Sequence, residues 1–194
     1  MALPVEAGDV YYRDLIGNIS TSHLRADFGA GETVLELTPR FPMFGGWRNH
    51  FTIGYNMPSA TALSKSGDKF RLQMPAVPDL YENYIIEELE LKFILPEGVN
   101  NVKYTSTIDL TRGEDTNRFT FLDTTGRVVV TTTGAKVAAE HGAKITLTYE
   151  WSSILIFKEP LLAISGWLVF FLFALFIGRL DFSIQPVDKK LKKQ

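Results

Sequence analysis

The feature that most constrains this chain is a run of eighteen uncharged residues, 161–178, near its C-terminal end. Only Ser165, Gly166 and Gly178 lie outside the apolar set. Eighteen helical residues extend about 27 Å, which is enough to cross the hydrocarbon core of an ordinary or thin bilayer. A buried helix of a soluble domain is the alternative, but such helices rarely run this far without a polar face. The sequence therefore predicts one transmembrane helix, within residues 158–180.

The basic residues around this run predict its orientation. Five basic side chains follow the run, whereas only Lys158 lies within fifteen positions before it. The positive-inside rule then places the tail, residues 181–194, in the cytosol and residues 1–157 across the membrane. The first residues have no signal-peptide pattern. We therefore expect that a translocation signal lies upstream of residue 1, or that the chain is a fragment or a truncated gene product.

The last five residues contain a possible targeting pattern. Lys190 and Lys192 stand fifth and third from the C-terminus, as in the dilysine pattern that retrieves membrane proteins to the endoplasmic reticulum. The alternative is that these lysines only set the topology and bind the lipid surface.

Residues 1–157 alternate with a period of two rather than 3.6. Apolar residues occupy every second position over 89–95 and again over 145–151, and charged or hydroxyl side chains separate them at every intervening position except Ile94. Such alternation is typical of antiparallel strands with one buried face. Glycines at positions 98, 113 and 126 indicate turns. The sequence predicts an all-β, sandwich-like domain of seven to nine strands, joined to the helix by a short hinge at 157–160.

The side chains that carry most enzyme chemistry are sparse. The chain has no cysteine, which excludes disulfides, thiolate metal sites and cysteine nucleophiles. His23, His50 and His141 are isolated, and no nucleophile elbow or phosphate-binding glycine pattern is present. Twenty basic and 22 acidic residues give a net charge of −2, so the chain has no general attraction for nucleic acid. We predict no catalytic, cofactor-binding or metal site.

Two segments of the β domain stand out. Asn18 begins the only Asn-X-Ser/Thr triplet, and the predicted topology makes it a glycosylation acceptor. Residues 39–48 contain two prolines, two glycines and three aromatic residues, which prevents a regular strand. This segment is either a rigid corner that covers an open edge of the sandwich or a partner-contact surface anchored by Phe44 and Trp47.

The chain resembles the ribophorin I family. The most specific match is PRFPMFGGW at 39–47. The remaining matches run in order along almost the whole chain, at residues 12–14, 16–23, 54–58, 95–98, 122–127, 158–162 and 179–184.

The resemblance implies an accessory, non-catalytic subunit of the oligosaccharyltransferase complex in the endoplasmic reticulum membrane. That complex transfers a preassembled oligosaccharide from dolichyl diphosphate to asparagine in nascent proteins. The implied partners are the other subunits, including a multi-spanning catalytic subunit that handles donor and metal. The resemblance also implies a further luminal domain before this one. Ribosome contact belongs to a cytosolic domain of animal members that this chain does not match, so it is not carried over.

Small residues suggest where the helix meets other subunits. Ala174 and Gly178 are four residues apart, and Ser165 and Gly166 form another small site. Close packing at small residues is one basis of helix association in bilayers. Lipid contact along the whole helix is the alternative.

Two other classes of protein remain open. An autonomous type I receptor or adhesion protein would also combine a β-sandwich ectodomain with one helix. A membrane-tethered hydrolase would need a nucleophile that the sequence does not reveal.

Overall fold

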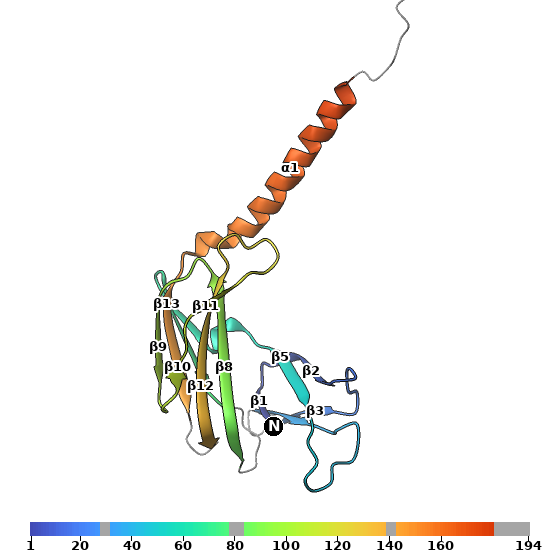
Figure 1. Cartoon of the computed structure of the whole chain (residues 1–194), viewed down its shortest axis with the longest axis vertical. Coiled ribbons are helices and arrows are strands. Elements are labelled where there is room, and N and C mark those ends of the chain that lie inside the picture. Colours follow the sequence, from blue (N-terminus) through green and yellow to red (C-terminus); the bar gives the residue numbers. More distant parts are fainter. Residues whose placement is uncertain (28–31, 78–83, 139–142, 181–194) are drawn as a thin grey trace, which may run out of the picture.

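The computed structural model describes residues 1–27, 32–77, 84–138 and 143–180. Within these ranges the chain forms thirteen strands, two short 3-10 helices and one α-helix (Figure 1). Every strand pairing is antiparallel. The prediction of an antiparallel β domain followed by one apolar helix is confirmed.

Two four-stranded sheets make up the larger part of the β domain. One has the strand order β6-β7-β13-β9. In the other, β12 is central: β8 pairs along one side, and the short strands β10 and β11 pair with different parts of the other side. The bounds are β6 Leu63–Ser66, β7 Lys69–Pro75, β8 Ile85–Glu97, β9 Asn100–Ser106, β10 Thr111–Arg112, β11 Thr116–Arg118, β12 Arg127–Ala138 and β13 Lys144–Glu150.

The core lies between these two sheets. Val130 of β12 and Leu147 of β13 are fully buried and belong to one cluster with Phe70 of β7 and Leu95 of β8. A second cluster, around Ile145, continues the core toward the other end of the strands. Apolar residues of β8 and β13 therefore face inward at alternate positions, as predicted. The two sheets pack face to face as a sandwich.

The first five strands form two smaller sheets outside this sandwich. One has the order β1-β4-β3 and the other pairs β2 with β5. Both lie beside the half of the sandwich that is farther from the helix (Figure 1). Their bounds are β1 Ala2–Pro4, β2 Gly8–Asp14, β3 His23–Asp27, β4 Glu32–Glu36 and β5 Phe51–Asn56.

The α-helix α1, Lys158–Arg179, follows the 3-10 helix η3, Ser153–Phe157, and extends away from the sandwich (Figure 1). The most apolar 18-residue stretch of Ser153–Arg179 has a mean hydropathy of 2.5 and no buried residue, so this segment is long and apolar enough to cross a membrane.

The expected hinge at 157–160 is wrong. Phe157 ends η3, and the next three residues form the first turn of α1. Pro160 is compatible with that turn because amides there have no partner within the helix. The connection between sandwich and helix is therefore helical from Ser153 onward.

Candidate functional site

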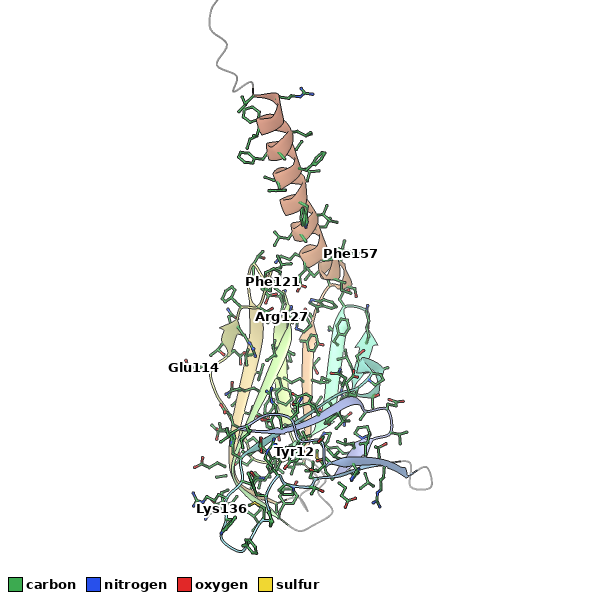
Figure 2. All side chains as sticks on the ribbon, turned by 90° about the vertical axis from the view of Figure 1, so that its right-hand side faces the viewer. Tyr12, Glu114, Phe121, Arg127, Lys136 and Phe157 are labelled. Carbon is green, nitrogen blue, oxygen red and sulfur yellow. The ribbon has the colours of Figure 1, made fainter. Side chains whose placement is uncertain are left out.

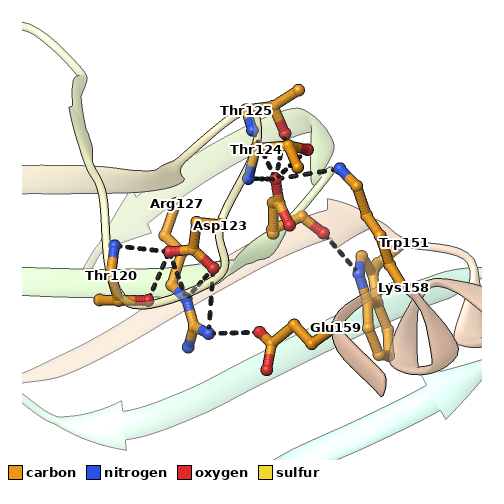
Figure 3. A network of polar contacts seen from close by, with 9 residues as sticks. Thr120, Asp123, Thr124, Thr125, Arg127, Trp151, Lys158 and Glu159 are labelled. Atoms are coloured by element: carbon orange, nitrogen blue, oxygen red, sulfur yellow. Dashed lines mark hydrogen bonds and ion pairs between the residues drawn. The ribbon is translucent and has the colours of Figure 1, made fainter. Parts of the chain in front are cut away.

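A network of charged and hydroxyl side chains occupies the junction between the sandwich and α1 (Figure 3). It draws residues from the end of β8, from the loop 119–126 between β11 and β12, from the start of β12, from just after β13 and from the first turn of α1. We call this set the junction network; its members are Glu97, Thr120, Asp123, Thr124, Thr125, Arg127, Trp151, Lys158 and Glu159.

Glu97 is the centre of the junction network. Its Oε1 atom accepts the backbone amides of Thr124 and Thr125 at 2.8 and 2.5 Å, and their hydroxyls at 3.0 and 2.7 Å. Lys158 Nζ of α1 donates to the same oxygen at 3.0 Å. The Thr125 backbone and hydroxyl bonds, followed by that of Lys158, hold the pKa of the Glu97 carboxyl well below its ordinary value. A carboxylate with only 7 % of its side chain exposed is satisfied in this way.

Arg127 forms the second connection between the sandwich and α1. Its Nε lies 3.1 Å from Asp123 Oδ2, and its Nη2 lies 2.8 Å from Glu159 Oε1. Asp123 also accepts the amide of Thr120 at 2.8 Å and the Thr120 hydroxyl. The Thr120 hydroxyl bond, together with Arg127, lowers the pKa of Asp123. One guanidinium thus bridges a loop carboxylate and a helix carboxylate.

Two contacts complete the junction behind the ion pairs. Trp151 Nε1, just after β13, donates to the backbone oxygen of Glu97 at 2.9 Å. Gly98 follows Glu97 with φ of +79°, and a Cβ built there would lie 2.7 Å from the Leu155 side chain of η3. Only glycine adopts this conformation easily and leaves room for that leucine. The turn after β8 is therefore fitted to η3.

The junction network is suited to hold the helix on the sandwich. The Glu97 and Asp123 carboxylates stay ionised because several donors stabilise the charged form and lower the pKa of each, whereas a general acid or base needs a pKa near the working pH. Within the described ranges of the chain, no three His, Asp or Glu side chains come together as a possible metal site.

A second polar cluster lies between the two small sheets. Arg40 Nε and Nη2 contact the Asp14 carboxylate at 2.7 and 3.1 Å, and Nη2 also donates to the backbone oxygens of Gly17 and Asn18 at 3.3 and 3.2 Å. Asp14 accepts the amides of Ile16 and Gly17. The Arg40 guanidinium and these amides hold the pKa of Asp14 well below its ordinary value.

This cluster joins the two segments singled out in the sequence. The Asn18 side chain is exposed, and its backbone oxygen is bound by Arg40. Phe44 and Trp47 are exposed too, and their rings meet edge to face at 5.1 Å. Segment 39–48 is irregular, as predicted. Arg40 contacts Asp14 at the end of β2 and Gly17 in the turn that follows.

The other predicted residues are scattered. Ser165 donates its hydroxyl to the Leu162 oxygen of its own helix, and a Cβ on Gly166 or Gly178 would meet open space. Ala174 is exposed on α1, and His23 and His50 are exposed on the small sheets and their loops. Lys190, Lys192 and His141 lie outside the described residues.

Sequence reasoning missed the junction network, although a signal was present. Three of the stretches that carry the family resemblance, 95–98, 122–127 and 158–162, contribute Glu97, Asp123, Arg127 and Lys158. Two others, 12–14 and 39–47, supply Asp14 and Arg40. Motifs far apart in the chain therefore meet at two places in the fold.

The comparisons with known proteins agree with one another. The family model described as Ribophorin I matches residues 1–178. The chain is 37% identical over 188 residues to Dolichyl-diphosphooligosaccharide--protein glycosyltransferase subunit 1 of Caenorhabditis elegans, covering 97% of this chain and 32% of that protein. It is 36% identical over 182 residues to subunit 1A of Arabidopsis thaliana, an alignment that covers 94% of this chain and 29% of that protein. It is also 36% identical over 182 residues to subunit 1B of Oryza sativa subsp. japonica, and this alignment covers 94% of this chain and 38% of that protein. The chain thus spans about a third of the length of these curated relatives.

Proposed function

The chain belongs to the ribophorin I family, and from this membership we propose that it is an accessory, non-catalytic subunit of an oligosaccharyltransferase complex. The complex transfers an oligosaccharide from dolichyl diphosphate to asparagine in Asn-X-Ser/Thr of nascent proteins. This chain has an assembly role: it contributes one membrane helix and holds a β domain in a fixed position above the bilayer.

The observation that carries this role is the connection of the sandwich to the first turn of α1. Lys158 and Glu159 of the helix bind Glu97 and Arg127 of the sandwich, at 3.0 and 2.8 Å. Two ion pairs from different strands oppose rotation of the domain about the helix axis. A subunit that presents a domain to its neighbours needs such a defined orientation, because a freely rotating domain would lose more entropy on assembly.

We place the β domain, residues 1–157, in the lumen of the endoplasmic reticulum and the tail, residues 181–194, in the cytosol. The helix at 158–180 then crosses once, in type I orientation. The basic residues after the helix support this orientation, and exposure of Asn18 fits a luminal acceptor. An Asn18→Gln variant is expected to migrate faster on gels, by one glycan. Equal migration of both forms would remove the support that Asn18 gives to this topology.

The face of α1 that carries Ala174 and Gly178 is our candidate contact with a helix of another subunit. These residues are four positions apart and share one face, and a Cβ on Gly178 would meet open space. A larger side chain there would leave the fold of this chain intact while blocking close approach of a second helix. Phe44 and Trp47 are the candidate anchors on the luminal side.

The test is a mild-detergent pull-down through the full chain. We expect the wild type to recover the other subunits, including the multi-spanning catalytic one, and Gly178→Leu to recover several-fold less. Val169→Leu is the matched control, because it adds one methylene on the opposite face of the helix. Wild-type chain that recovers none of these subunits would contradict the proposed function; equal recovery in both variants would contradict only the contact at Gly178.

A further inference from the structure

An apolar groove of about 490 Å³ lies between the loop 119–126 and α1. Phe121 and Leu122 form the loop side. Leu162, Gly166, Trp167 and Phe170 form the helix side. Phe121 lies at the helix end of the β domain, well away from Glu114 and Lys136 (Figure 2).

The loop exposes more apolar surface than a water-facing loop would. Phe121 is 87% exposed and Phe119 is 64% exposed. Phe119 packs on Gly126, where a Cβ would lie 3.2 Å from the ring. Ile154, Ile156 and Phe157 of η3 are also largely exposed around the base of the helix. Contiguous apolar patches of this kind mark surfaces that bind a protein or a membrane.

The position of the groove along α1 gives the depth at which the groove would lie in a bilayer. Gly166 and Phe170 lie about 7.5 and 13 Å past Leu161, where the uncharged run begins. One leaflet contributes about 15 Å of hydrocarbon. If α1 crosses the bilayer, a side chain that faces these helix residues lies within the leaflet on the side of the β domain.

Four backbone amides of the loop 119–126 are bonded within the protein. The amide of Thr120 donates to Asp123, and the amide of Asp123 donates to the Thr120 oxygen at 3.1 Å. The amides of Thr124 and Thr125 donate to Glu97. Amides bonded within the protein can enter an apolar medium at little cost, whereas free ones cannot.

The backbone conformation of Leu122 also supports a binding role for the loop. Its φ is +69°, a region that branched side chains rarely adopt. This backbone directs Leu122 into the groove beside Phe121. Strain at an exposed loop tip is consistent with a binding role for that tip.

We propose that the loop 119–122 is a second membrane anchor, with the Phe121 ring inserted among phospholipid acyl chains that fill the groove. Lipid is the occupant because the helix side of the groove is continuous with a segment that is apolar on all sides. The nearby Ser165 hydroxyl is bonded to its own helix, so it offers no donor to a partner. The inference depends on the proposed membrane span of α1.

The absence of cysteine allows a direct test in the full chain. Single cysteines at Phe121, Leu168 and Glu114 are labelled with the same environment-sensitive fluorophore. The chains are reconstituted in phosphatidylcholine vesicles that contain lipid spin-labelled on the acyl chain. Phe121→Cys removes no core packing, because the ring is exposed. Leu168→Cys reports the span itself, and Glu114→Cys reports an exposed position away from the helix (Figure 2).

We expect quenching at Phe121 within about twofold of that at Leu168, and none at Glu114. Quenching at Leu168 with none at Phe121 would overturn the anchor while leaving the span intact. No quenching at Leu168 would overturn the span and the anchor together. A Phe121 probe that loses its quenching in the purified complex would assign the groove to a neighbouring protein helix and overturn the lipid assignment.

Discussion

Replacement of Glu97 by alanine tests the junction network most directly. The change removes the oxygen that accepts two amides, two hydroxyls and Lys158. A buried donor left without an acceptor costs about 1–3 kcal/mol, and bonds to one oxygen do not add fully. The Lys158 side chain is 34% exposed, so water screens its ion pair with Glu97. Loss of this ion pair therefore contributes about 1 kcal/mol or less to the destabilisation. We expect a total loss of about 3–5 kcal/mol, most of it from the two threonines.

The assay is denaturant unfolding of the full chain in detergent micelles, followed by far-ultraviolet circular dichroism of the sheets. In thermal unfolding of the same sample, a loss of about 3–5 kcal/mol corresponds to a drop in Tm of about 6–20 °C for a protein of this size. Glu97→Gln keeps one acceptor oxygen, removes the charge and replaces the other oxygen with an amide NH2 group, so it should cost about 1–2 kcal/mol. Glu88→Ala, exposed on the same strand, is the control and should change stability by less than about 0.5 kcal/mol.

The outcome that refutes this reasoning is a Glu97→Ala variant as stable as Glu88→Ala. It would mean that the Thr124 and Thr125 amides form hydrogen bonds with water instead of Glu97 without loss of stability, and therefore that the junction network is not buried in the functional protein. A double-mutant cycle with Lys158→Ala should give a coupling energy of about 1 kcal/mol or less. A much larger coupling would shift the main contribution from the threonines to the ion pair.

Two further predictions concern the pH dependence of the junction network and the Arg40 cluster beside the small sheets. The pKa of Glu97 is lowered on folding from its ordinary value of 4.5, so its stabilising effect is complete above that pH and declines as the pH falls below it. Denaturation curves measured against pH should show a smaller acid loss for Glu97→Gln than for wild type; equal losses would contradict the prediction. Arg40→Ala should speed hydrogen exchange of the Ile16 and Gly17 amides about tenfold, because Asp14 loses the guanidinium that positions it. Mass spectrometry of the peptide that spans these residues measures the exchange, and unchanged protection would show that Arg40 does not hold this turn.

Local patterns were sufficient to predict some elements. Alternation over 145–149 placed Ile145, Leu147 and Tyr149 on the buried face of one strand, and all three are buried in β13. The uncharged run predicted the helix because a long stretch without a polar face has few other stable environments. The hinge expected at 157–160 was wrong because these residues are helical, and Pro160 lies in the first turn of α1, where proline is tolerated.

The sequence by itself determined the buried face of the strands over 89–95 and 145–151 and the segment that is apolar enough to cross a membrane, because both depend on neighbours a few residues apart. Only the tertiary structure decided that Glu97 binds Thr125 and Lys158, which are 28 and 61 positions away. It also decided that the first five strands form sheets of their own. Period-two alternation fixes a strand's faces but not its partner strand, and loop residues such as 119–126 follow no period at all. The hydrogen-bond partners of these loop residues depend on which elements lie beside the loop in the folded chain.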